Sequence, residues 1–294
     1  MLNVRAGVSF ATTAAAALIA VSAAAAMDEA GVPVDLTGLL ARVGERVEAY
    51  YARAQSIICF ETVRVLRMNR NLTPLTGVRQ LVYELHVSRD RATDTDPMPE
   101  ANVIRELKTI NGRPPKSNAE NDCLDPNPIS LDPLSFLLPH HQRDYRFSYK
   151  GSGRSNGRAA AMLDYAPASP GPMEVTWIDG CASVEVPART TGRVWIDTAT
   201  GDVLRVDEQT RGPIDVEVPR PQRLSESVTS LMLERATSSI RYKVVTFTNP
   251  DETLLLPEST EMMSFVSGVG FVSLQITHTF TGYQRFVTGA RIVN

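Results

Sequence analysis

An alternation of apolar and polar residues with a period of two begins at Ile57 and constrains the fold of this chain more than any other sequence feature. Successive side chains of a β-strand point to opposite faces, so this period is typical of strands that turn one face toward a core. The first run ends at residues 69–71, and a later one ends at Asn111-Gly112, a dipeptide that favours tight hairpin turns. We therefore expect about ten or eleven antiparallel strands joined by local connections.

One helix is expected before the first strand. Residues 36–54 carry apolar side chains at intervals of three and four residues, and Asp35 stands where an N-cap belongs. A second, short helix is expected inside the Pro-rich stretch 113–141, because Pro133 can open it and Pro139 can end it. The predicted fold class is mainly β with helices (α+β), and a long loop of this kind usually serves a function.

Residues 1–26 have the composition of a secretory signal peptide. Arg5 precedes a short, alanine-rich apolar run that ends in small residues. The run is too short to span a bilayer, which needs about 20 strongly apolar residues. Because no cysteine follows until Cys59, no lipid-attachment site is expected at the cleavage point. We therefore expect one exported, soluble and monomeric domain, 27–294, that works in the periplasm or outside the cell.

Charge and cysteine content narrow the function classes. The formal net charge of −3 at pH 7 lacks the basic footprint of a nucleic-acid-binding protein. An odd cysteine count in an exported protein suggests one disulfide and one buried thiol. Cys59 lies in an apolar run and is expected in the core, whereas Cys123 and Cys181 lie in turn-like sequence and are the favoured pair among the alternatives. The spacing of the cysteines does not fit a zinc site.

The sequence contains no recognised catalytic pattern. GxSxG, SxxK and HExxH motifs are all missing from it. His86 and His278 each alternate along a predicted strand, so no cluster of metal ligands is expected. Asp197 and Asp202 are expected to bond the local backbone of a turn. We therefore expect no catalytic residues, no metal, no cofactor and no enzymatic activity.

Three segments of the chain together resemble a known family. They are the helix 36–54 that runs into 57–68, the hairpin 192–204 (GRVWIDTATGDVL) and the C-terminal series that starts at Leu256-Pro257 and ends in the strand 277–286 (THTFTGYQRF). In this order they resemble periplasmic lipoprotein carriers of the LolA/LolB type. The resemblance implies an open antiparallel half-barrel with an N-terminal helix, a short lid helix and a cavity for an acyl chain, a lipid or a hydrophobic peptide. The stretch 113–141 and the cysteine pair depart from those carriers.

The cavity implied by the resemblance agrees with the apolar residues found on both faces of several predicted strands. A curved sheet covered by few helices can leave a ligand cavity between its layers. A fully packed core is the alternative. The residues expected to line the cavity or its lid are Leu81, Tyr83, Leu85, Leu134, Phe136, Leu137 and Trp195.

Three functions are compatible with the sequence. The favoured hypothesis is an exported binder or carrier of a lipid-like or other hydrophobic ligand in the bacterial periplasm. The alternative is a partner-binding module that contacts an envelope protein through residues 113–141 and transports no ligand. A hydrolase is the least favoured hypothesis, since no Ser, His and Asp residues cluster in the sequence.

Overall fold

The fold is described from a computed structural model. It covers residues 35–54, 56–69, 71–75, 77–89, 101–115, 133–169, 171, 173–178, 181–185, 189–223, 229–268 and 273–285. The predicted signal peptide 1–26, Cys123 and residues 116–132 of the Pro-rich stretch lie outside the described residues. The processing of the N-terminus and the pairing of Cys123 with Cys181 therefore stay predictions.

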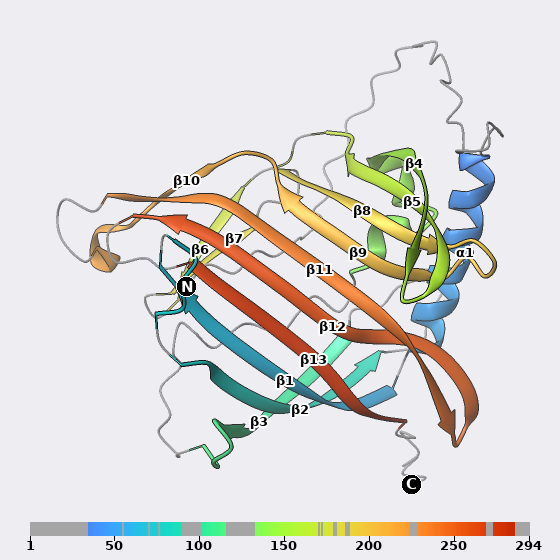
Figure 1. The fold of residues 1–294 in the computed structure, drawn as a ribbon, viewed down its shortest axis with the longest axis horizontal. Helices are drawn as coiled ribbons and strands as arrows, with labels where there is room; N and C mark the ends of the chain where they lie inside the picture. The colour runs from blue at the N-terminus through green and yellow to red at the C-terminus, as the bar shows by residue number, and fades with distance from the viewer. Residues whose placement is uncertain are drawn as a thin grey trace, which may run out of the picture.

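Eleven strands form one open antiparallel sheet, with the order β3-β2-β1-β13-β12-β11-β9-β8-β5-β4 and with β10 paired to β11 (Figure 1). The sheet does not close, because its outermost strands in the described part of the chain, β3 and β4, do not pair with each other. This arrangement confirms the predicted fold class and the open half-barrel. The strands are β1 (Ser56–Met68), β2 (Arg79–Arg89), β3 (Ala101–Ile110), β4 (Tyr145–Ser155), β5 (Arg158–Pro167), β8 (Thr190–Asp197), β9 (Val203–Thr210), β10 (Ile214–Glu217), β11 (Ser230–Thr248), β12 (Asp251–Ser267) and β13 (Ser273–Arg285).

A separate two-stranded sheet accompanies the large one. It consists of β6 (Glu174–Ile178) and β7 (Cys181–Glu185). Val184 of this hairpin is buried in a cluster with β10 and β11, which includes Val216 and Leu233. The hairpin therefore adds a small second core at one end of the large sheet.

Helix α1 (Leu36–Arg53) is the predicted N-terminal helix, and Asp35 caps it by accepting a hydrogen bond from the Gly38 amide (2.9 Å). Its apolar stripe packs on one face of the sheet, which we call the inner face, and the opposite face is the outer face. The predicted short helix is the single 3-10 turn η1 (Ser135–Leu137), which packs beside α1 on the inner face. Their shared core contains Leu39, Val43, Val47, Phe136, Leu137, Leu163, Val194, Ile196 and Val206.

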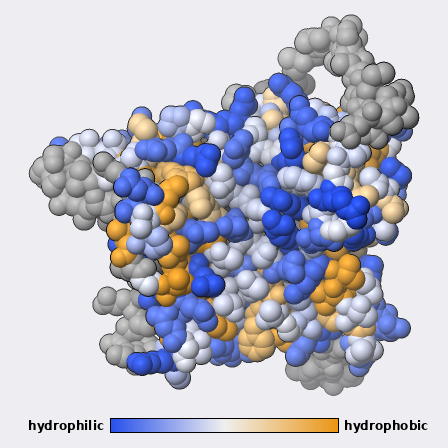
Figure 2. All heavy atoms as spheres, viewed as in Figure 1, coloured by the Kyte–Doolittle hydropathy of each residue, from blue (hydrophilic) through white to orange (hydrophobic). Residues whose placement is uncertain are grey.

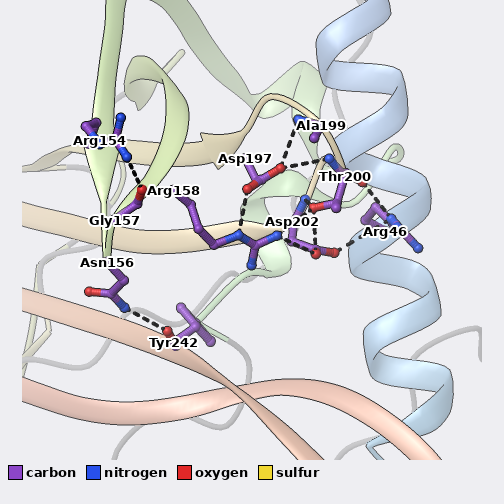
Figure 3. Close-up of polar contacts among 10 residues, drawn as sticks. All are labelled: Arg46, Arg154, Asn156, Gly157, Arg158, Asp197, Ala199, Thr200, Asp202 and Tyr242. Atoms are coloured by element: carbon purple, nitrogen blue, oxygen red, sulfur yellow. Dashed lines mark hydrogen bonds and ion pairs between the residues drawn. The ribbon is translucent and has the colours of Figure 1, made fainter.

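The turn between β8 and β9 holds the side of α1 (Figure 3). Asp197 accepts hydrogen bonds from the amides of Ala199 (2.9 Å) and Thr200 (2.8 Å), as the sequence predicts, and its second oxygen lies 2.7 Å from Arg158 Nε. The turn thus ordered presents the Thr200 carbonyl, which accepts a hydrogen bond from Arg46 Nε of α1 at 2.8 Å. The polar turn therefore fixes where α1 lies across the end of the sheet.

In the part of the chain that the structure describes, no helix combines the length and the apolar composition needed to cross a membrane.

Candidate functional site

A mostly apolar cavity of about 90 Å³ lies on the inner face, between the end of α1 and the sheet. It is covered by Tyr50 and Tyr51 of α1, by the C-cap residue Ala54 and by Pro133 before η1. Its floor is formed by β1, β2, β12 and β13, with Leu85 of β2 among the lining residues. The strands of the floor are held by ladders of backbone hydrogen bonds, whereas the cover depends on side-chain contacts.

Side-chain hydrogen bonds hold the cover of the cavity in place. The Tyr51 hydroxyl accepts a hydrogen bond from the Leu134 amide at 3.1 Å, which joins α1 to the η1 segment. Arg53 at the end of α1 donates to the Thr253 carbonyl of β12 at 2.7 Å. The first contact joins the two covering segments to each other, and the second joins them to the sheet.

Strand register places a row of residues from four strands side by side on the inner face. Ile240 of β11 pairs with Thr260 of β12, Thr260 pairs with His278 of β13, and His278 pairs with Val63 of β1. Because side chains alternate along a strand, Glu61 lies on the same face as Val63. Two titratable groups and a hydroxyl are therefore set into an otherwise apolar surface.

Glu61 is the centre of a buried polar network. Its two carboxylate oxygens lie 2.6 Å from His278 Nδ1 and 2.8 Å from Arg105 Nε. The Arg105 guanidinium also stacks on the Tyr83 ring, 3.6 Å from its centroid. Burial by itself raises the pKa of Glu61, but the hydrogen bonds and charges of His278 and Arg105 outweigh it and hold the pKa below its ordinary value. Glu61 is therefore an anion in the folded protein at neutral pH.

Thr260 and Cys59 are the other reactive side chains at the cavity. Thr260 Oγ1 makes no hydrogen bond to any described residue, so His278 does not activate it as a general base activates a nucleophile. Burial, with a further effect of the Glu61 charge, raises the pKa of the Cys59 thiol to about 12. The thiolate is the nucleophilic form of cysteine, so Cys59 is inert at neutral pH. Cys59 is a buried free thiol, as predicted from the sequence.

The residues predicted to line the cavity or its lid fall into three groups. Leu81, Tyr83 and Leu85 of β2 are buried on the inner face beside the cavity, and Leu85 lines it. Leu134, Phe136 and Leu137 are buried with α1 in the neighbouring core and do not line the cavity, although Pro133 beside them does.

Trp195 lies apart from the other predicted residues. It stands between Val194 and Ile196, which are buried under α1, so its own side chain faces the outer side of the sheet. There it lines a groove of about 730 Å³. The guanidinium carbons of Arg193 and Arg205 lie 6.0 Å and 4.6 Å from the centroid of its ring. Figure 2 shows this outer face, on which the most hydrophilic residues gather over β8 and β9.

Carboxylates on the outer face and at the turn between β8 and β9 form ion pairs and hydrogen bonds with nearby residues. Asp207 pairs with Arg205 at 2.6 Å, and Asp202 accepts a hydrogen bond from the Thr200 hydroxyl at 2.6 Å. Among the described residues, no group of three or more His, Cys, Asp and Glu side chains has a geometry that could hold a metal ion.

Comparison with known proteins adds structural similarities alone. No family model matches the chain, and no curated protein matches it. A domain from Vibrio parahaemolyticus described as an outer membrane lipoprotein-sorting protein is 10% identical, with a TM-score of 0.40 over 85% of this chain and 93% of that chain. A LolA superfamily protein from Nitrosomonas europaea is 9% identical, with a TM-score of 0.36 over 87% of this chain and 97% of that chain.

A chain of the MucA/MucB complex of Pseudomonas aeruginosa is a further, weaker similarity. It is 12% identical, with a TM-score of 0.23 over 86% of this chain and 100% of that chain. At these identities and TM-scores, none of them says what this chain binds, which has to be argued from its own residues.

Proposed function

We propose that this protein is an exported binder or carrier of a lipid-like or other hydrophobic ligand, held on the inner face of the half-barrel. The cavity between α1 and strands β1, β2, β12 and β13 is the observation that supports this proposal. Placing an apolar chain there removes apolar surface from water, at a gain of about 25 cal/mol for each Å². The inert Cys59 and the unactivated Thr260 favour binding over catalysis.

The ligand enters by displacing the cover of the cavity. Sites for drug-sized molecules span roughly 300–1,000 Å³, so a cavity of about 90 Å³ has to expand to hold a long acyl chain. The hydrogen-bonded floor resists such a change more than the cover does. We therefore assign the expansion to the end of α1 and the segment that begins at Pro133, which are joined through Tyr51 and Leu134.

The predicted signal peptide, residues 1–26, supports a place of action in the periplasm or outside the cell. A hydrophobic ligand needs a carrier in such an aqueous compartment, because its own apolar surface is costly to expose to water. Location and cavity therefore agree with a carrier function.

Displacement of a fluorescent apolar probe, N-phenyl-naphthylamine, tests the proposal with two matched variants. Val87 and Val82 both belong to β2, but Val87 lines the cavity and Val82 faces the outer side. Val87→Trp fills the cavity and is expected to weaken binding of the probe and of decanoic acid by at least about tenfold. Val82→Trp is expected to leave both affinities unchanged.

Two results would contradict the proposed function. One is wild-type protein that binds neither the probe nor decanoic acid. The other is equal loss of binding in both variants, which would place the ligand elsewhere. Circular dichroism and urea unfolding establish that each variant is folded. If Val87→Trp does not fold, Ala54→Leu at the end of α1 fills the same cavity from its cover.

A further inference from the structure

Two members of the polar row line the cavity, and the third, His278, lies between them without lining it. Glu61 and Thr260 both line the cavity, and His278 lies on the strand between theirs. Glu61 contacts His278 from β1, and Thr260 is the register partner of His278 on β12. The imidazole is therefore held by Glu61 of β1, and Thr260 is its register partner on the strand at the other side.

Two atoms of this row have hydrogen-bonding capacity that the described residues do not use. They are His278 Nε2 and Thr260 Oγ1, and neither has a hydrogen-bond partner in the described part of the chain. His278 is 0% exposed and Thr260 is 2% exposed. Buried polar atoms without a partner are costly and uncommon in folded proteins. A bound group that satisfies both atoms removes this cost.

The donor and acceptor roles of the two atoms follow from their partners. An ionised carboxylate only accepts hydrogen bonds, so His278 Nδ1 carries the hydrogen in its contact with Glu61. The other nitrogen, Nε2, accepts a hydrogen bond in the neutral imidazole and donates one in the charged imidazolium. The Thr260 hydroxyl can take either role. The complementary ligand group both donates and accepts, and it carries no negative charge, because it lies near the Glu61 carboxylate.

We infer that the cavity selects single-chain amphiphiles that end in a hydroxyl group, either an alcohol or an un-ionised carboxylic acid. The ligand hydroxyl bonds both His278 Nε2 and Thr260 Oγ1, donating to one and accepting from the other, and the apolar chain runs along the wall that includes Phe280 and Tyr50. This inference rests on the proposed function, since it names the ligand class of the same cavity.

Decanol and chlorodecane separate the polar contact from the apolar one, because they share a chain and differ in the terminal group. In displacement of N-phenyl-naphthylamine, we expect wild-type protein to bind decanol about three- to tenfold more tightly than chlorodecane. Thr260→Val removes the hydroxyl at nearly constant shape, and it is expected to abolish this preference by weakening decanol alone. Thr260→Ser keeps the hydroxyl and is expected to keep the preference for decanol.

Thr279→Val is the matched control, because Thr279 neighbours His278 on β13 but is exposed on the outer face. It is expected to leave both affinities at the wild-type value. Equal affinity of wild-type protein for decanol and chlorodecane would overturn the inference and leave the proposed function standing. A loss of affinity in Thr260→Val that is equal for both compounds would also overturn the inference. If the probe binds and neither compound displaces it, the inference fails alone. If wild-type protein binds neither the probe nor decanoic acid, the proposed function fails and the inference fails with it.

Discussion

Glu61 occupies a position that the alternation of β1 reserves for apolar side chains. Its neighbours on the same face, Cys59 and Val63, are buried in the core of the inner face. A carboxylate in such a place needs compensating partners, and it has them in His278 and Arg105. Buried ion pairs often contribute little net stability compared with apolar residues. The proposed function gives this network a role in binding.

The depressed pKa of Glu61 predicts how stability depends on pH. The folded state holds this pKa below the ordinary value of 4.5, so the unfolded state takes up the proton more readily. The stability that Glu61 contributes is fully present above about pH 4.5 and is lost as the pH falls through the lower pKa of the folded state. Glu61→Gln is expected to cost about 1–3 kcal/mol at neutral pH, and this difference from wild type should shrink in acid.

Urea unfolding between neutral pH and about pH 3 measures this difference. Glu45→Gln on the exposed side of α1 is the control, with an expected change within about 0.5 kcal/mol at every pH. A difference between wild type and Glu61→Gln that is independent of pH would show that the ionised carboxylate is not what the folded state stabilises.

At the scale of elements, η1 is small but central to the core. Its Phe136 stacks on Tyr165 of β5 with ring centroids 4.1 Å apart, and it also contacts Phe147 of β4. A single 3-10 turn has little stability of its own. Its position therefore depends on this aromatic packing and on the contact between Tyr51 and Leu134.

Phe136→Ala is expected to lower the free energy of unfolding by about 3–5 kcal/mol, because it leaves a cavity under α1 and η1. Urea unfolding measures the loss. Phe60→Ala removes the same side chain from the outer face, where Phe60 is 40% exposed, and should cost less than about 1 kcal/mol. Equal losses in the two variants would mean that η1 does not anchor the core.

The elements with a strong local signal could be predicted from the sequence. The apolar stripe and Asp35 predict α1, and the alternation from Ile57 predicts β1 together with its buried face. Asn111-Gly112 adopts the positive φ values, 50° and 76°, that its turn requires. Sequential pairs such as β8 and β9 agree with the expected local connections. The long-range pairings could not be predicted, since β1 pairs with β13 from the other end of the chain. Such pairing is decided by tertiary packing and not by local sequence.

For the whole molecule, the candidate site was only half predictable. A cavity on the inner face and Leu85 in its wall follow from the resemblance and the alternation. The polar network was missed, because Glu61 and His278 are 217 residues apart in the sequence. The sequence did hold a signal for it: both residues stand in the apolar phase of an alternating strand. Trp195 has the opposite phase to its buried neighbours, which places it on the outer face.

Native mass spectrometry of the protein, purified from the cells that make it, tests the central claim most directly. If the inner face carries a hydrophobic ligand, wild-type protein and Val82→Trp should show an added mass in the range of a single lipid or fatty acyl compound. Val87→Trp, with its cavity filled, should show mostly the mass of the protein alone. Ligand-free spectra of wild-type protein, or an added mass that persists in Val87→Trp, would contradict the account.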